Sequence, residues 1–307
     1  MNRITESYAV HAEMKPDQIA IIDEQESITY QDWYERVQRS AQWLQGTVHQ
    51  QKRIAFLLLS NGASFLQIFA GAAYAGWTAV PLDPRWSHEE CVEKLLLSEA
   101  DLAIIEDRLI KRFEQGSVDM PLLSLSEWKE RMSLLTDSPY NSCDTEKDPV
   151  FYMGFTSGST GSPKAFIRRQ QSWIESFQMT AASFGITHQD HALILGTLLS
   201  SHFLYGAIST LYFGGTVTLL EKFVPVKAKK ALETGDITVM YTVPTMTETL
   251  LQIEAYREDN PLLVMSSGAD WSVSSKEQLV TNYPHVTFFF LILWHIRVKF
   301  CLLFVFK

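Results

Sequence analysis

Cysteine and positive charge are both scarce in this sequence. The three cysteines, Cys91, Cys143 and Cys301, are scattered over 307 residues. They have neither the paired spacing of a metal site nor the density of a disulfide framework, so we expect a cytoplasmic protein with no metal site of its own. Lys and Arg number 26 against 35 Asp and Glu, which gives a net charge of -9 at pH 7. Because binding to a nucleic-acid backbone needs clustered Lys and Arg, we do not expect a nucleic-acid partner.

Long uninterrupted apolar runs are also missing. Residues 1–18 lack the apolar core of a signal peptide. The most apolar stretch is residues 286–307, where His295, Arg297 and Lys299 separate two short runs. Each run is far shorter than the roughly 20 residues that cross a bilayer, so no membrane span is expected.

What the sequence contains is an alternation of short apolar strands with helical patterns. Continuous apolar strands separated by helices predict an α/β fold with largely parallel sheets covered by helices on both faces. The polar stretch 136–148 is the best candidate for a linker between two subdomains. We therefore expect a first α/β subdomain over 1–148 and a second over 149–290, with residues 291–307 as a separate tail.

Two helices have specific local signals. In the segment 31–45, every third or fourth residue is apolar, which predicts one buried helical face. The residues of that face are Trp33, Val37, Ala41 and Leu44. Further along, Ser87 and Glu90 have the spacing of a capping box, in which the side chain of each residue binds the backbone N–H of the other.

A loop rich in hydroxyl groups and glycine follows the apolar strand 149–155. Glycines let backbone N–H groups turn toward an anion, hydroxyls add donors, and a lysine adds positive charge, so the loop is suited to hold the phosphates of ATP. A flexible surface loop is the alternative. The ordered Gly-x-x-Gly-x-Pro-Lys series after a buried strand favours the phosphate site, although it is not a Walker A loop. The candidate residues are Thr156, Ser157, Gly158, Ser159, Thr160, Gly161 and Lys164.

From Phe155 to Lys164 the sequence resembles the signature of the adenylate-forming superfamily, which includes acyl-CoA synthetases, peptide-synthetase adenylation domains and luciferases. Ala165 departs mildly from the usual Gly. Four more stretches resemble the family in the same order, and the resemblance extends over roughly residues 5–290. These stretches are Ile28–Tyr30, Ala75–Pro84, Ser201–Thr216 and Ser266–Ala269.

The resemblance implies the large N-terminal domain of an acyl-CoA-synthetase-like ligase. It implies that a carboxylate attacks the α-phosphate of ATP with Mg²⁺ present, and that a thiol, usually that of coenzyme A, then displaces AMP. Thr156 and Lys164 would act in catalysis. The residues beside the adenine would be Ser267, Gly268 and Ala269. The residues bordering the acid would be His202, Phe203 and Gly206.

The resemblance alone does not identify the carboxylic acid substrate or the thiol that accepts the acyl group. Peptide-synthetase domains place an Asp in the segment matching Leu199–Gly206 to pair with an α-ammonium group, and no acidic residue is present there. An unpaired ammonium is costly to bury, so we expect an acid without an α-amino group, with a fatty acid favoured over an aryl acid. A carrier protein could replace coenzyme A as the acceptor. A nucleotide-binding pseudoenzyme is the remaining alternative, and His202 could be an ordinary histidine at a helix start.

The family pattern is expected to continue with Tyr-Gly-x-(Ser/Thr)-Glu, a ribose-binding Asp and a small domain with a catalytic Lys, none of which these 307 residues contain. Residues 292–301 can be back-translated so that a one-base shift reads Phe-Tyr-Gly-Thr-Ser-Glu-Leu-Ser-Phe. We therefore expect the tail 291–307 to be an out-of-frame translation and the fragment to be inactive. The alternative is a genuine apolar C-terminal strand.

Overall fold

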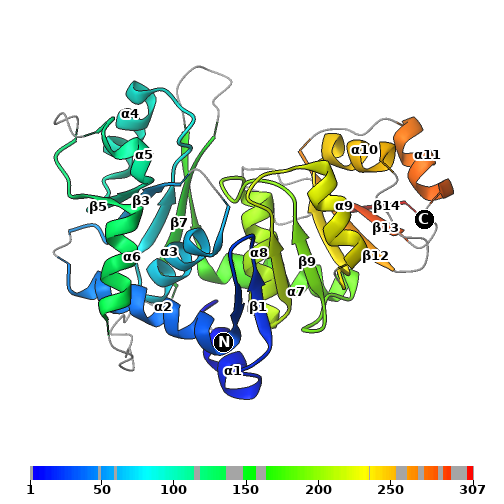
Figure 1. Cartoon of the computed structure of the whole chain (residues 1–307), viewed down its shortest axis with the longest axis horizontal. Coiled ribbons are helices and arrows are strands. Elements are labelled where there is room, and N and C mark those ends of the chain that lie inside the picture. The colour runs from blue at the N-terminus through cyan, green and yellow to red at the C-terminus, as the bar shows by residue number, and fades with distance from the viewer. Residues whose placement is uncertain are drawn as a thin grey trace. The chain divides into compact units, whose positions relative to one another are not determined.

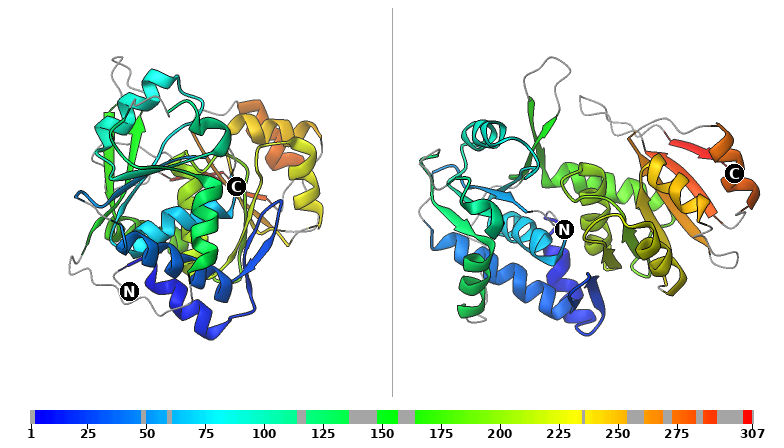
Figure 2. Two further views of the ribbon diagram at one scale, coloured as in Figure 1. Left: turned by 60° about the vertical axis from the view of Figure 1, so that its left-hand side comes forward. Right: turned by 45° about the horizontal axis from the view of Figure 1, so that its top comes forward.

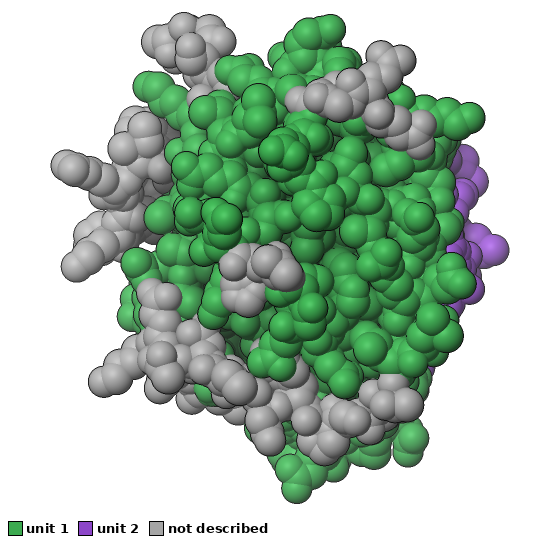
Figure 3. Space-filling model, turned by 90° about the vertical axis from the view of Figure 1, so that its left-hand side faces the viewer, with its two compact units in different colours: residues 1–18, 29–59, 63–185 green, residues 19–28, 60–62, 186–307 purple. Residues whose placement is uncertain are grey.

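The computed structural model comprises two compact units of the chain, drawn in Figures 1 and 2 and coloured separately in Figure 3. Unit 1 is formed by Met1–Gln18, Thr29–Leu59 and Ala63–Gly185, and unit 2 by Ile19–Ile28, Ser60–Gly62 and Ile186–Lys307. The subdomain boundary expected after residue 148 lies within the range of unit 1. The structure describes residues 3–47, 50–58, 61–113, 118–135, 148–156, 164–234, 236–253, 261–268, 273–282, 286–291 and 303–306.

Unit 1 is built on a six-stranded sheet. Its strands are β3 (Arg53–Leu57), β4 (Thr78–Pro81), β5 (Leu102–Ile105), β6 (Leu122–Ser124), β7 (Val150–Thr156) and β8 (Lys164–Arg169). They lie in the order β6-β5-β3-β4-β7-β8. All neighbours are parallel except β7 and β8, which form an antiparallel pair. Strands β4 and β5 are buried at every residue, as expected where helices cover both faces of a parallel sheet.

The helices of unit 1 confirm both local predictions. They are α1 (Glu6–Met14), α2 (Tyr30–Gln45), α3 (Ala63–Tyr74), α4 (His88–Ser98), α5 (Asp107–Ile110), α6 (Leu125–Leu134) and α7 (Gln170–Phe184). The apolar face of α2 is buried at all four predicted positions. At the start of α4, the backbone N–H of Glu90 donates to Ser87 Oγ and that of Ser87 donates to Glu90 Oε2.

Unit 2 is built on an eight-stranded sheet. Its strands are β1 (Ile19–Ile22), β2 (Ser27–Thr29), β9 (His191–Ile194), β10 (Thr216–Leu219), β11 (Val239–Thr242), β12 (Leu262–Ser267), β13 (Val286–Leu291) and β14 (Leu303–Phe306). They lie in the order β14-β13-β12-β11-β9-β10-β1-β2. The sheet is parallel from β1 to β13. The predicted α/β fold with largely parallel sheets is therefore confirmed.

The helices of unit 2 divide between the two faces of its sheet. They are α8 (Ser201–Phe213), α9 (Pro225–Thr234), α10 (Pro244–Gln252) and α11 (Val273–Asn282). Met240 of β11 belongs to a core cluster with residues of α9 and α10. Since neighbouring strand residues point to opposite faces, Tyr241 points the other way, toward α8. Helix α8 is buried from His202 to Tyr212.

The C-terminal tail contributes one described strand. Strand β14 pairs antiparallel with β13, with Phe306 opposite Phe288, while residues 292–302 lie outside the described part of the chain. The out-of-frame origin of the tail stays a prediction about the DNA. Among the described residues, no helix is both long enough and apolar enough to cross a membrane.

Candidate functional site

The carboxyl ends of β11 and β12 lie next to each other in unit 2. Thr242 ends β11 and is in register with Ser266 of β12. Strand β12 ends one residue later, at Ser267, and Gly268 follows with a positive φ of 109°. In open parallel α/β sheets, ligands bind outside the carboxyl ends of the strands. A binding site in unit 2 is therefore expected at this edge.

His202, in the first turn of α8, is bound to that edge. Its side chain is buried, and Nε2 lies 3.0 Å from the carbonyl oxygen of Thr242 and 3.1 Å from that of Met265. Both partners are acceptors, so Nε2 carries the proton and Nδ1 is an acceptor. Burial lowers the pKa of His202 to about 4. The ring is therefore neutral at pH 7 and brings no positive charge to a bound carboxylate.

Two polar atoms at this edge are buried without a hydrogen-bond partner among the described residues. They are Nδ1 of His202 and Oγ of Ser266, and Ser266 follows Met265, whose carbonyl binds the His202 ring. Leaving such an atom unsatisfied costs about 1–3 kcal/mol. His202 lies on the α8 face of the sheet, whereas Ser266 is in register with Thr242, whose hydroxyl contacts that of Thr247 in α10, and so points to the opposite face. Among the described residues, each face of this carboxyl edge thus has one buried polar atom without a partner. The hydrogen bonds of Nε2 are those of an ordinary buried histidine, while Nδ1 has no partner among the described residues.

The three residues predicted to border the acid all lie in the first half of α8. The Phe203 ring centroid is 5.1 Å from that of His202, and the Tyr241 ring centroid is 5.5 Å from it. Gly206 lies against the same tyrosine, since a Cβ built on Gly206 would be 2.6 Å from the Tyr241 ring. The structure thus brings His202 and Gly206 together around Tyr241, which the sequence did not point to.

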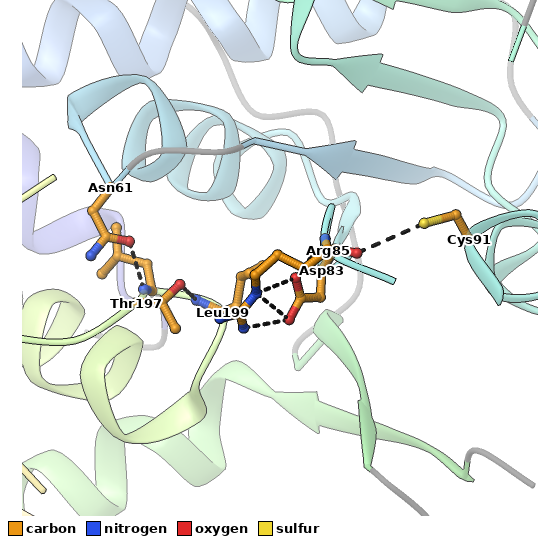
Figure 4. A network of polar contacts seen from close by, with 7 residues as sticks. Asn61, Asp83, Arg85, Cys91, Thr197 and Leu199 are labelled. Carbon is orange, nitrogen blue, oxygen red and sulfur yellow. Dashed lines mark hydrogen bonds and ion pairs between the residues drawn. The ribbon is translucent and has the colours of Figure 1, made fainter. Parts of the chain in front are cut away.

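The loop of residues 195–200, which leads into α8, is held by Asn61 (Figure 4). Asn61 Nδ2 donates to the carbonyl oxygens of Gly196 (2.7 Å) and Leu220 (3.2 Å), and its Oδ1 accepts from the backbone N–H of Leu198 (2.9 Å). Sequence reasoning missed this residue. The available signal was a polar residue placed between the apolar strand β3 and the apolar helix α3.

Asp83 and its neighbours form a second polar cluster, in unit 1 (Figure 4). Its carboxylate accepts from Arg85, with Arg85 Nη2 2.6 Å from Asp83 Oδ2. The thiol of Cys91 lies 3.8 Å from the carbonyl oxygen of Asp83. These contacts stabilise the turn between β4 and α4. Among the described residues, no group of three or more His, Cys, Asp or Glu side chains could hold a metal ion.

The predicted phosphate loop is closed by a strand pair in unit 1. Thr156 is the last residue of β7, Lys164 is the first of β8, and the two are partners in the antiparallel ladder. Lys164 is exposed. The hairpin therefore holds the two ends of the loop side by side. Residues 157–163 lie outside the described part, and with them Ser157, Gly158, Ser159, Thr160 and Gly161, as does Ala269.

A largely parallel α/β fold with a Ser/Thr/Gly segment between the paired strands β7 and β8 has the features of the class of nucleotide-binding α/β proteins. The model of the AMP-binding enzyme family matches residues 8–288, and the chain belongs to this family. The resemblance to the adenylate-forming superfamily is confirmed.

Individual proteins are similar to the chain over most of its length. It is 47% identical over 285 residues to an uncharacterized acyl-CoA ligase, YhfT, of Bacillus subtilis. That match covers 92% of this chain but only 58% of the relative. Among solved structures, VinN in complex with L-aspartate has a TM-score of 0.85 at 21% identity, with 95% of this chain and 76% of that chain covered. The inhibitor-bound N-terminal domain of FACL13 from Mycobacterium tuberculosis has a TM-score of 0.84 at 18% identity, with 96% and 76% covered. At these identities the structures show the fold alone.

Proposed function

We propose that the chain forms the nucleotide- and acid-binding part of an AMP-forming acid–CoA ligase. The observation that carries the proposal is the loop from Thr156 to Lys164, which has the family signature and whose ends are paired by β7 and β8. In the proposed reaction, a carboxylate oxygen attacks the α-phosphate of ATP and pyrophosphate leaves. The thiol of coenzyme A then attacks the acyl carbon and releases AMP.

The proposed roles follow the chemistry of each group. The loop residues and Lys164 hold the phosphates, because N–H groups, hydroxyls and a cation stabilise the charge that moves to the leaving pyrophosphate. Mg²⁺ accompanies ATP as a counter-charge. Ser267, Gly268 and Ala269 border the adenine, and the carboxyl edge of β11 and β12 receives the acid beside His202.

The environment of His202 supports an acid without an α-amino group. Segment Leu199–Gly206 contains no acidic residue, and the low pKa of His202, caused by burial, reflects a site that disfavours a buried positive charge. An ammonium group at this position would therefore be desolvated without a partner. We propose a fatty acid as the substrate class.

Lys164→Ala should weaken the binding of ATP with Mg²⁺ by about 10- to 100-fold. A charge-assisted hydrogen bond contributes about 1.5–3 kcal/mol, and each 1.4 kcal/mol is about ten-fold in Kd. Isothermal titration calorimetry on the 307-residue chain measures the effect. Lys129→Ala, at an exposed position of α6, changes the net charge equally and should leave Kd unaltered. Equal Kd values for the wild type and Lys164→Ala would remove Lys164 from the phosphate site.

Analogues of the adenylate test the substrate class. Butyryl-sulfamoyl adenosine should bind at least about ten-fold more tightly than its 2-aminobutyryl counterpart, because the added ammonium loses its hydration without gaining a carboxylate. The two analogues differ only in the amino group, so each is the control for the other. Equal or tighter binding of the amino compound would show that the segment around His202 has been misinterpreted.

A further inference from the structure

The contact between α1 and α2 in unit 1 (Figure 1) contains three buried polar atoms that have no hydrogen-bond partner among the described residues. They are Oγ1 of Thr5, the hydroxyl oxygen of Tyr8 and Nε1 of Trp33. Thr5 is 1% exposed, and Tyr8 and Trp33 are fully buried. The proposed function uses none of these residues, which lie neither in the phosphate loop nor at the carboxyl edge of β11 and β12.

The three side chains gather around Tyr8. Thr5 is the N-cap of α1, and its side chain makes no capping hydrogen bond. Because Thr5 precedes Tyr8 by three residues, both side chains lie on the same face of the helix, and a long side chain such as that of Tyr8 leans toward the helix N-terminus. The Tyr8 ring also contacts Trp33 of α2, with ring centroids 5.7 Å apart and ring planes at 66°. Tyr8 is therefore a neighbour of both other residues.

Three such atoms are costly to leave unpaired together. A single buried polar atom without a partner lowers the folding equilibrium constant by roughly 5- to 150-fold. Three of them would remove a large part of the small net stability of a domain. Burial also raises the pKa of Tyr8 above its ordinary value, so the phenol stays neutral and keeps its proton as a donor. A partner for these atoms is therefore expected at the contact of α1 and α2.

The chemistry of the three groups fits a water molecule. The indole N–H of Trp33 only donates, while the hydroxyls of Thr5 and Tyr8 donate or accept. The indole N–H repels a cation, and a buried anion would need a positive charge, which none of the three side chains carries. Buried waters typically make about three hydrogen bonds to groups that would otherwise be unsatisfied, and three such groups are present.

We propose that an ordered water molecule bridges α1 and α2, accepting from the indole N–H of Trp33 and bonding to the hydroxyls of Tyr8 and Thr5. The proposal goes beyond the ligase function and does not depend on it. Gln170 binds the same end of α1 to α3, since its Oε1 accepts from the backbone N–H of Ile4 (2.9 Å) and its Nε2 donates to the carbonyl oxygen of Ala73 (3.2 Å). The start of α1 is then held to α3 directly and to α2 through the water.

A high-resolution crystal structure of the 307-residue protein tests the proposal directly. Density for a water at about 2.7–3.2 Å from Trp33 Nε1 and from at least one of the two hydroxyl oxygens is expected. A dry cluster would overturn the proposal, whether the indole N–H faces the Tyr8 ring or the side chains bond to other protein groups. This measurement needs no variant, so the proposal stays testable if the substitutions below prevent folding.

Tyr8→Phe removes only the hydroxyl and tests the same point in solution. If the hydroxyl binds the water, the Tm should fall by about 2 °C or more, because a buried hydrogen bond is lost. If the hydroxyl is unpaired, its removal should raise the Tm or leave it unchanged, which would overturn the proposal.

Thr5→Val removes the other hydroxyl at nearly constant volume and, since Thr5 makes no capping hydrogen bond, should lower the Tm through the water alone. Thr5→Val and Tyr8→Phe combined should lower the Tm by less than the sum of the two single losses, because both act on one water. Strictly additive losses would overturn the shared water.

Discussion

Asn61→Asp should destabilise the protein by about 3–5 kcal/mol. The Asn61 amide donates to two buried carbonyl oxygens, those of Gly196 and Leu220, and a carboxylate would place an oxygen opposite both. Each buried acceptor left unpaired costs about 1–3 kcal/mol, and burying the charge adds to this. Urea-induced unfolding followed by circular dichroism gives the free energy of unfolding.

The matched control is Gln178→Glu, the same amide-to-carboxylate change at an exposed position of α7. It should change the free energy of unfolding by less than about 0.5 kcal/mol, as surface substitutions usually do. Asn61→Ala loses the hydrogen bonds without adding a charge. Its loss in free energy of unfolding should lie between those of Asn61→Asp and Gln178→Glu. If Asn61→Asp were as stable as the wild type, the hydrogen bonds of Asn61 would not hold the loop that leads into α8.

Acidification below pH 6.5 should cost the protein about 3 kcal/mol through His202 alone. Burial lowers the pKa of His202 from 6.5 to about 4 in the folded state. Between these values the unfolded chain binds a proton that the folded protein does not, so stability falls as the pH falls. The contribution is complete above pH 6.5 and is lost progressively toward pH 4; at about 1.4 kcal/mol per unit of pKa, it amounts to about 3 kcal/mol.

Unfolding free energies measured from pH 5 to pH 7.5 isolate this effect from the carboxylates, which titrate at lower pH. His202→Gln should flatten the dependence, while His188→Gln, at an exposed position, should leave it unchanged. Burial also lowers the pKa of His191, so a smaller slope should persist in His202→Gln. A slope equal to that of the wild type in His202→Gln would show that folding does not lower the pKa of His202.

Local signals in the sequence predicted much of the fold. The periodicity of α2 and the capping box of Ser87 and Glu90 depend only on residues close in the chain, and both are confirmed. The same signature at Ser124 and Glu127 forms a second capping box at the start of α6, which we did not predict. The pairing of β1 with β10 brings Ile21 beside Val217. The hydrophobic periodicity of a short segment cannot predict which distant strand that segment pairs with.

In the candidate site, too, features set by neighbouring residues could be predicted, and contacts between distant segments could not. The position of His202 at a helix start was readable from the sequence, but its tautomer was not, because the two carbonyl groups that fix it come from β11 and β12. Tyr241 and Asn61 were missed for a related reason. Each acts on residues distant in the chain, and neither belongs to a recognisable motif.

The position of β1 in the sheet of unit 2 has a consequence for the order of folding during translation. Strand β1 pairs with β10, and Thr216 Oγ1 donates to the carbonyl oxygen of Ile19, 197 residues away. At about 5–20 residues per second, a ribosome needs roughly 10–40 s to add the residues between these strands. Throughout that interval β1 can pair only with β2, and the other edge of this apolar strand is open to contacts with other nascent chains. The first strand to be synthesised thus finds one neighbour at once, in β2, and the other only after most of the chain has left the ribosome.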